Sequence, residues 1–232
     1  MDIKTLPNHI AIIPDGNRRW AKSHNLPAFE GHRKGAQTAV KIAKYLRKLG
    51  VHTLTLWVFS TENKSRDSKE VDNLMKLFEI YFDKLVADAL KDNVRAIHLG
   101  RKDRIPMSLL KKIEDLEEKT KGFKEYTLNI ALDYGGHDEI IRAVNKVKGE
   151  RGKGKGIDEK EFESYLDTAD QLYPDPDLII RTSGEMRTSG LLPWQTVYSE
   201  YFFLDKYFPD LTEKDIDNAL KKYSRRNRRF GR

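Results

Sequence analysis

A cluster of side chains that can bind anions follows a short apolar run near the start of the chain. The run Ile10–Ile13 is branched and apolar, which is typical of a buried strand, and Pro14 ends it. The cluster itself is Asp15, Gly16, Asn17, Arg18 and Arg19. Its arginine and asparagine side chains can donate hydrogen bonds to anionic oxygens, and its glycine lets the backbone approach a ligand closely.

Asp15 is the informative member of this cluster, because it is itself an anion. A carboxylate is compatible with a nearby phosphate only if a hard cation such as Mg²⁺ lies between them. The segment therefore indicates a Mg²⁺–diphosphate site on a strand-to-helix turn, at the edge of an α/β sheet where ligands bind. Taken alone, it is equally compatible with an ordinary polar loop that carries two solvated arginines.

Two further polar segments follow predicted strands. Phe59–Arg66 supplies hydroxyl groups, a carboxylate, an amide and an arginine, although this composition is also typical of helix caps. Arg181–Ser189 places two arginines and two serines around Gly184, which suits a diphosphate clamp. In a parallel sheet the carboxyl ends of the strands meet at one edge. Three arginine-containing loops at that edge predict two anionic substrate groups, or one large one.

Glu200 is a carboxylate within an aromatic and apolar stretch, Leu191–Phe203. An unpaired charge in such surroundings is costly. We therefore expect a cation or an arginine beside Glu200.

Strand and helix patterns alternate along the chain. The strand candidates are His9–Ile13, Thr53–Phe59, Val94–Leu99, Tyr126–Leu132, Asp177–Arg181 and Tyr201–Leu204. Helical spacing covers Gly31–Leu49, Lys69–Leu90, Ile105–Lys121, Asp138–Lys148 and Thr212–Tyr223. The alternation predicts an α/β fold: a mainly parallel six-stranded sheet with helices on both faces, in one domain over residues 1–232. We expect Gly149–Gly156 to be a flexible, basic surface loop.

The segment Lys69–Leu90 carries a strong apolar stripe, with aromatic residues close together at Phe78 and Phe82. Most of this stripe is expected to pack on the sheet, and part of it could wall an apolar tunnel. Core and hydrocarbon pockets use the same residue types, so the periodicity does not separate the two. Val58 and the Phe78–Phe82 region are the candidates for the floor of such a tunnel.

The composition limits the function classes. The chain has 232 residues, no cysteine and a net charge of +7, from 43 Lys+Arg against 36 Asp+Glu. The absence of cysteine excludes disulfides, thiolate metal sites and cysteine nucleophiles. The charge favours anionic partners, but no nucleic-acid recognition motif is present, so we expect no nucleic acid. Without a signal-peptide core or an apolar stretch of roughly 20 residues, we expect a cytoplasmic protein that can associate peripherally with a membrane.

These segments together resemble the cis-prenyltransferases, the Z-type isoprenyl diphosphate synthases that include undecaprenyl diphosphate synthase. The matching segments are His9–Lys22, Gly31–Gly35, Phe59–Asn63 with Arg66, Leu128–Gly136, Arg181–Glu185 and Tyr198–Phe202. Arg228–Gly231 is similar to the Arg-x-Gly ending of the family. The likeness runs in order over nearly the whole chain, and the sequence looks closer to archaeal members than to typical bacterial ones.

The resemblance implies an enzyme that condenses isopentenyl diphosphate with an allylic diphosphate in cis configuration, giving a polyprenyl diphosphate that serves as a lipid-carrier precursor. Mg²⁺ would be the cofactor, held by Asp15, with Glu200 as a second metal ligand. Asn63, with Ser60 near it, would assist removal of the proton after carbon–carbon bond formation; the alternative proton acceptor is the released diphosphate, because an amide is a poor base.

The substrate-binding residues that the resemblance implies fall into two groups and a tail. Those around the allylic diphosphate are Gly16, Asn17, Arg18, Arg19, Trp20, His32, Ser60, Thr61, Glu62 and Arg66. Those around the diphosphate of isopentenyl diphosphate are Arg181, Arg187, Thr188 and Ser189. Arg229 and Gly231 would close the active site of a partner subunit, since the family forms homodimers.

Two alternatives stay open within this resemblance. One is a non-catalytic partner subunit, although such subunits typically lack the first-motif aspartate and the arginine set that this chain has. The other is transfer to a prenylated glyceryl phosphate or a similar acceptor. The chain also departs from the common bacterial pattern at Lys64 and Asp67, where tryptophan and proline are usual, and at Gly190–Leu191. The departures leave the allylic primer and the product length open.

Overall fold

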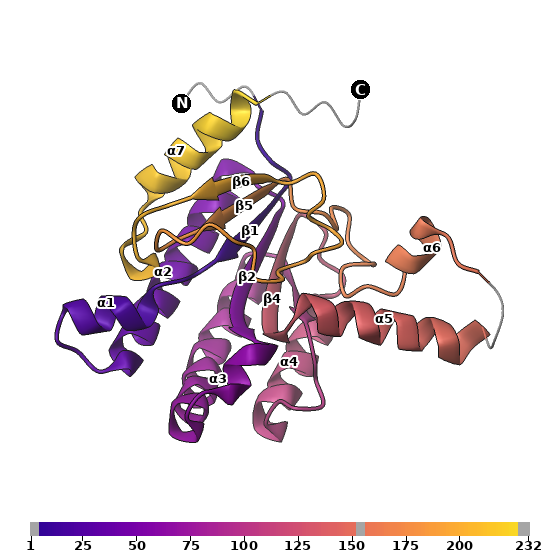
Figure 1. The fold of residues 1–232 in the computed structure, drawn as a ribbon, viewed down its shortest axis with the longest axis horizontal. Helices are drawn as coiled ribbons and strands as arrows, with labels where there is room; N and C mark the ends of the chain where they lie inside the picture. The colour runs from indigo at the N-terminus through magenta and orange to yellow at the C-terminus, as the bar shows by residue number, and fades with distance from the viewer. Residues whose placement is uncertain (1–4, 152–155, 227–232) are drawn as a thin grey trace.

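The computed structural model describes residues 5–151 and 156–226 as an α/β fold around one six-stranded sheet (Figure 1). Its strands are β1 (His9–Ile13), β2 (Thr53–Ser60), β3 (Val94–Leu99), β4 (Tyr126–Tyr134), β5 (Leu178–Arg181) and β6 (Glu200–Phe203). The order across the sheet is β3-β4-β2-β1-β5-β6, and every neighbouring pair is parallel. The predicted fold class is confirmed, with each strand within two residues of its expected bounds.

Five helices begin and end within three residues of their predicted bounds, and two short ones, Asn17–Ser23 and Glu159–Glu163, were not predicted. The helices are α1 (Asn17–Ser23), α2 (Ala28–Leu49), α3 (Ser68–Lys91), α4 (Met107–Thr120), α5 (Gly136–Arg151), α6 (Glu159–Glu163) and α7 (Glu213–Ser224), with the 3₁₀ helices η1 (Thr61–Ser65) and η2 (Phe208–Asp210). Asp67, one of the departures noted above, caps α3 by accepting from the backbone N–H groups of Lys69 and Glu70. The expected Gly149–Gly156 loop is wrong at its start, because α5 continues to Arg151; its residues 152–155 lie outside the described part.

The two faces of the sheet are covered unequally. Alternate strand residues such as Ile10 and Ile12 point into the larger core, which α2, α3, α4 and α7 cover. Ala11 and Ile13 point to the opposite face, where the irregular Leu191–Leu192 segment packs on them. Helices α5 and α6 share a small core of their own and extend to one side (Figure 1). The prediction of helices on both faces therefore holds for the first face, while an irregular segment closes much of the second.

The strand order places a crevice at the carboxyl end of β1. The chain passes from β1 to β2 on one side, and later crosses back so that β5 lies on the other side of β1. In open α/β sheets such a reversal is where ligands bind. The last paired residues are Ile13 and Arg181. The loop after β1 and the loop after β5 consequently meet at this crevice.

Candidate active site

Asp15 and Arg181 join the two loops at the crevice. Arg181 Nη2 donates to Asp15 Oδ2 at 2.9 Å, and Arg181 Nη1 donates to Ser189 Oγ at 2.8 Å. On the other side Arg19 Nη2 lies 3.2 Å from Asp15 Oδ1. The Asp15 carboxylate is thus held between two guanidinium groups, one from each loop, and it remains partly exposed.

The backbone at Gly16 allows these loops to approach each other. Gly16 has φ of 103°, in the left-handed region that favours glycine. A Cβ atom there would lie 2.7 Å from Tyr207 Cδ1 and 2.9 Å from Ser183 Cβ. Helix α1 begins at the next residue, so Gly16 turns the chain from the strand into the helix that carries Arg19. A larger residue at this position would push the two loops apart.

Glu185 connects the arginines on the outer side of the crevice. Its Oε1 lies 3.2 Å from Arg19 Nη1, and its Oε2 accepts from Arg187 Nη1 at 2.5 Å. Glu185 belongs to the matching segment Arg181–Glu185 but is not among the predicted site residues. Its position between two predicted phosphate ligands could be read only from the structure, because the loop after β5 folds back on itself.

A second cationic cluster lies where α1, α2 and α3 meet. Arg66 Nη1 lies 3.2 Å from Glu70 Oε1, while Arg18 Nε and His32 Nε2 lie 3.8 Å and 3.9 Å from the same oxygen. His32 Nε2 is buried and has no hydrogen-bond partner among the protein atoms. Burial, and then the positive charge of Arg66, lower the pKa of His32 to about 4, although Glu70 opposes the shift. Glu70 is the other residue that the sequence prediction missed.

Asn17 adds a second unpaired polar group to this cluster. Its Oδ1 is buried without a partner, while its Nδ2 donates to Pro14 O at 3.3 Å. Gly35 leaves room for the amide, since a Cβ atom there would lie 2.3 Å from Asn17 Oδ1. Buried polar groups are normally satisfied, so these two groups indicate a place for a polar ligand.

An apolar cavity of about 150 Å³ opens beside this second cluster, between α2 and α3 and above the sheet. Asn17 and His32 line its polar end, and Val58, Phe78 and Phe82 are among its apolar lining. A smaller cavity of about 60 Å³ shares four of the lining residues and lies toward the amino ends of the strands. The residues common to both are Val40, Ala43, Leu85 and Leu128. An apolar space thus begins at a cationic cluster, and both Val58 and the Phe78–Phe82 region contribute to it.

The segment after β2 is held by local hydrogen bonds. Asn63 Oδ1 accepts from the Ser60 backbone N–H at 3.2 Å, and the two residues form a capping box at the start of η1. Thr61 Oγ1 donates to Glu62 Oε1 at 2.9 Å. Lys64 donates to the Arg104 carbonyl at 2.8 Å, so lysine has a hydrogen-bond partner at this position, where bacterial members usually have tryptophan. The predicted Asn63 and Ser60 are therefore neighbours, as their proposed roles require.

Two predicted site residues lie apart from the carboxylate centre. Trp20 is buried, and its Nε1 donates to Asp210 Oδ1 at 2.8 Å, so its indole is turned toward η2 and does not line the cavity. Glu200 is the first residue of β6 and is in register with Leu178, whereas Arg181 is in register with Phe203. Glu200 therefore stands about 10 Å back along the strands from the level of Arg181. The fold does not bring Glu200 to Asp15 within one chain.

The remaining predictions are placed in part. The cationic partner expected for Glu200 is Arg226, whose Nε lies 3.8 Å from Glu200 Oε2. Thr188 lies in the loop after β5 with Ser189, and its carbonyl accepts from the Leu191 N–H at 3.1 Å. Arg229 and Gly231 lie outside the described residues.

The donor set around Asp15 suits one kind of metal site. Among residues 5–151 and 156–226 no group of three or more histidine, aspartate or glutamate side chains could hold a metal ion. Mg²⁺ is commonly bound through one or two carboxylates together with substrate phosphates and water. A single partly exposed carboxylate between arginines fits an ion that arrives with an anionic substrate, and does not form a closed protein cage.

Residues 13–231 match the model of a protein family described as "Putative undecaprenyl diphosphate synthase". The chain belongs to this family of cis-prenyltransferases. It is 48% identical over 228 residues to an isoprenyl transferase of Fusobacterium nucleatum, covering 98% of this chain and 97% of the relative. Its identity to the tritrans,polycis-undecaprenyl-diphosphate synthase (geranylgeranyl-diphosphate specific) of Pyrococcus horikoshii is 43%, covering 98% and 88%. These two identities do not support the expected archaeal character.

The structure of this cis-prenyltransferase is similar to a solved one from a plant. Lavandulyl diphosphate synthase from Lavandula x intermedia, in complex with dimethylallyl diphosphate, matches with a TM-score of 0.93 and 36% sequence identity. The match covers 98% of this chain and 99% of the plant chain. In the part of the chain that the structure describes, we found no helix with the length and apolar character needed to cross a membrane.

Proposed function

We propose that this cis-prenyltransferase condenses isopentenyl diphosphate with an allylic prenyl diphosphate and makes a polyprenyl diphosphate that serves as a lipid-carrier precursor. The observation that carries the proposal is the Asp15 carboxylate held between Arg19 and Arg181 at the crevice between β1 and β5. A second cationic cluster lies beside it and opens onto an apolar cavity. A reaction that joins two diphosphate substrates and buries their hydrocarbon chain would need these three features.

The two clusters differ in what lies behind them, and this difference assigns the substrates. The cluster of Arg18, His32 and Arg66 adjoins the cavity, so it suits the allylic diphosphate, whose hydrocarbon must be buried. The clamp of Arg181, Arg187 and Ser189 is not part of the lining of this cavity and suits isopentenyl diphosphate. A neutral His32 can donate one hydrogen bond to a phosphate oxygen through its unpartnered Nε2.

Asp15 is the residue that would hold Mg²⁺. Bound there, the ion would stabilise the charge that develops on the leaving diphosphate. Arg19 and Arg181 flank Asp15, and guanidinium groups can bind phosphate oxygens through two parallel hydrogen bonds. Glu200 could serve the same centre only from a second copy of the chain, given its place at the amino end of β6.

Bond formation can be written with these groups in place. The carbon–oxygen bond of the allylic substrate breaks, and its electron pair leaves with the diphosphate. The double bond of isopentenyl diphosphate supplies the electron pair for the new carbon–carbon bond. A proton is then lost to restore a double bond, and we assign the released diphosphate as its acceptor because the Asn63 amide is a poor base. Asn63, fixed by its contact with the Ser60 N–H, would orient the reacting group.

The apolar cavity is proposed as the start of the product tunnel. Each added isoprene buries roughly five carbons at about 0.8 kcal/mol for each methylene-sized group, so elongation into free space is favourable and ends where side chains block it. Val58 and Phe82 lie along this path. Leu85 is among the residues that line both cavities, so it is a further candidate for a side chain that blocks the path.

A homodimer is proposed from the contrast between the two sheet edges. At β3 the outward backbone N–H groups of Ala96, His98 and Gly100 donate to side chains of Thr120, Glu117 and Asp167, which closes that edge. Next to β6 the large apolar side chains Val197, Tyr198 and Tyr201 are exposed. A second copy seated on the β6 side would cover them and bring its Glu200 and carboxyl-terminal tail toward the neighbouring site. Cytoplasmic location, with peripheral contact to a membrane as product leaves, completes the proposal.

The test is a direct assay of chain elongation. The protein is incubated with labelled isopentenyl diphosphate, Mg²⁺ and a panel of allylic primers, and product length and double-bond configuration are measured. We expect label in a polyprenyl product with cis bonds, and no product when Mg²⁺ is chelated. Failure to incorporate label with every primer, by protein shown to be folded, would reject the proposal and favour a non-catalytic partner subunit.

A further inference from the structure

Glu185 occupies the space between two arginines that could otherwise bind phosphate. One carboxylate oxygen lies 3.2 Å from Arg19 Nη1, and the other accepts from Arg187 Nη1 at 2.5 Å. Arg19 comes from α1 and Arg187 from the loop after β5, so the carboxylate bridges the same two segments that the crevice separates. A diphosphate has two phosphoryl groups and could make the same pair of contacts.

The backbone is arranged to place Glu185 there. Ser183 has φ of 76°, which is uncommon for a residue with a side chain, and Gly184 follows with φ of 74°. The N–H groups of these two residues donate to the carbonyls of Lys206 and Leu204 at 2.7 Å and 2.8 Å, which holds the turn. Strained positions of this kind persist where the surroundings determine them, and they gather at ligand sites.

The charges around the crevice are nearly balanced without a ligand. Three guanidinium groups, from Arg19, Arg181 and Arg187, face two carboxylates, from Asp15 and Glu185. The hydrogen bond from Arg187 lowers the pKa of Glu185, so the carboxylate is charged at neutral pH. Protonation therefore does not release it, and another anion must take its place.

We propose that the Glu185 carboxylate is an internal substitute for a phosphoryl group, and that a diphosphate binds to Arg19 and Arg187 by displacing it. This inference rests on the proposed function, because Arg187 belongs to the clamp assigned there to isopentenyl diphosphate. Glu185 makes one contact with each arginine, so a ligand must replace two contacts to gain the site. A diphosphate can replace both contacts with its two phosphoryl groups, whereas a single phosphate has only one group for the two arginines. Glu185 thus acts as a specificity-determining residue for diphosphate over monophosphate.

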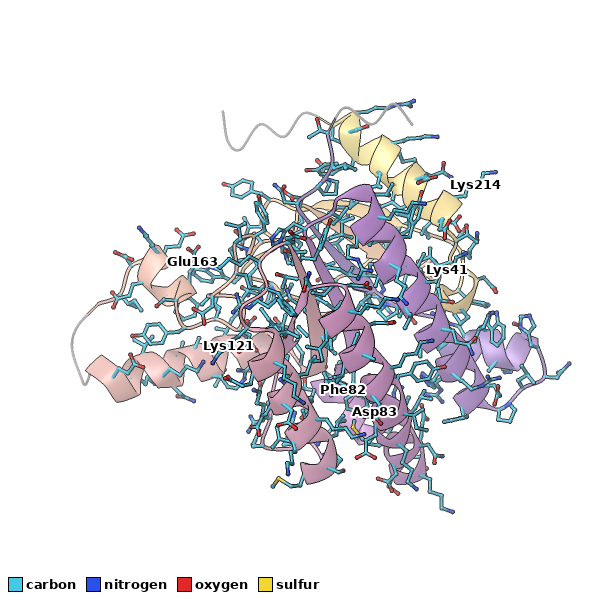
Figure 2. The ribbon with its side chains drawn as sticks, turned by 180° about the vertical axis from the view of Figure 1, so that it is seen from behind. Lys41, Phe82, Asp83, Lys121, Glu163 and Lys214 are labelled. Carbon is cyan, nitrogen blue, oxygen red and sulfur yellow. The ribbon has the colours of Figure 1, made fainter. Side chains whose placement is uncertain are left out.

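The experiment measures anion binding without turnover. The full chain, its Glu185→Gln variant and a matched Glu163→Gln variant are titrated calorimetrically with inorganic diphosphate and with inorganic phosphate at fixed Mg²⁺. Glu163 is a suitable control because it lies on α6, which stands on the other side of the molecule from α1 (Figures 1 and 2). We expect Glu185→Gln to bind diphosphate about twofold to fivefold tighter, because the free energy of an exposed ion pair corresponds to a change in affinity of that size. Phosphate affinity should rise by a larger factor, and Glu163→Gln should match the parent.

A second pair of variants tests whether the effect passes through Arg187. The gain from Glu185→Gln should be smaller when Arg187→Gln is already present, since only the ion pair with Arg19 is then left to release. Unchanged or weaker diphosphate binding by Glu185→Gln, with thermal unfolding like that of the parent, would overturn the proposal. A gain that is undiminished in the double variant would also overturn it. Because no prenyl transfer is measured, either result is separate from failure of the elongation assay.

Discussion

Two clusters of charged side chains in this molecule look alike in composition and differ in how they are paired. One is the crevice cluster of Asp15, Arg19, Arg181, Glu185 and Arg187. The other, which we call the brace, lies at the start of α5 and consists of Asp138, Glu139, Arg142 and Asp167. Both contain carboxylates beside arginines, so sequence composition does not tell them apart. The hydrogen bonds within each cluster do tell the two clusters apart.

The brace directs its charges at one another. Arg142 Nε donates to Asp138 at 2.8 Å, and its two terminal nitrogens donate to Asp167 at 2.7 Å and 2.6 Å. Glu139 is only 1% exposed and accepts from the Tyr134 hydroxyl at 2.5 Å. Burial, and then the neighbouring Asp167, raise the pKa of Glu139. Such an arrangement stabilises the junction of α5, the loop before β5 and the segment after it.

The crevice instead keeps polar groups available. Arg181 Nε is buried without a partner, and so are His32 Nε2 and Asn17 Oδ1 in the adjoining cluster. The Arg19 side chain is 44% exposed, and Glu185 can be exchanged for another anion. The comparison teaches that a charged cluster is a candidate site when it has more positive charges than the neighbouring carboxylates neutralise. A cluster in which carboxylates neutralise every cation stabilises the fold instead.

The largest expected effect separates the two clusters at Asp15. Asp15→Ala should lower kcat by about a thousandfold, because the metal ligand is lost, while the fold is kept. Steady-state rates at saturating Mg²⁺ and circular dichroism measure both. Asp83→Ala is the matched control, since Asp83 is an exposed aspartate of α3 paired with Lys112 (Figure 2). Near-parent activity in Asp15→Ala would remove the metal-ligand assignment.

The brace should respond in the opposite way. Arg142→Met leaves Asp167 without its cation, whereas Asp138 keeps Arg101. Losing one partner of a buried ion pair costs about 3 kcal/mol. Urea unfolding should show that loss of free energy, whereas diphosphate affinity of the folded variant should stay within about twofold of the parent. The comparison fails if Arg142→Met keeps its stability and loses diphosphate binding.

The apolar cavity beside the second cationic cluster offers a third test, because none of the four brace residues lines it. Val58→Leu adds volume to the cavity wall, so we expect shorter products and a stability cost of about 1 kcal/mol. Phe78→Ala or Phe82→Ala should lengthen the product if either ring blocks the path. Product distributions are compared by chromatography. Parent-like distributions from all three variants would place the floor elsewhere, for example at the shared residues near Leu85.

The smallest effect concerns two buried histidines, one in the second cationic cluster and one within the sheet. Burial lowers the pKa of His32 to about 4 and that of His9, in the sheet, to about 3. Both stay neutral when folded and take up a proton when unfolded below pH 6.5, so stability is present above that pH and is lost as the pH falls. Each contributes about 1.4 kcal/mol per pH unit over its window.

Ligand binding should separate these histidines. Inorganic diphosphate should raise the pKa of His32, which faces the anion site, and leave that of His9 unchanged. Histidine resonances followed by NMR across pH measure both values. A shift at His9, or none at His32, would contradict the assignment of the allylic diphosphate to the second cluster.

The sequence by itself determined the strands, the parallel α/β class and the first motif. Branched apolar runs such as Ile10–Ile13 form strands through local preference and burial, and a carboxylate among arginines after such a run carries its chemistry in a few adjacent residues. The helical stripe of α3 was equally local, since spacing alone places Phe78 and Phe82 on one side. These features depend on neighbours in the chain, so they can be read from it.

Only the tertiary structure decided which charged residues meet. Glu185 reaches Arg19 through a turn that no periodic pattern records, at the left-handed Ser183. Glu70 follows Arg66 at the i,i+4 spacing, but its approach to Arg18 and His32 depends on how α1, α2 and α3 pack together. Glu200 lies in the right motif and still stands at the opposite end of its strand, because the register of β6 on β5 is set by packing between distant segments. Pairing between residues far apart in the chain depends on register and crossover, and these are properties of the folded sheet.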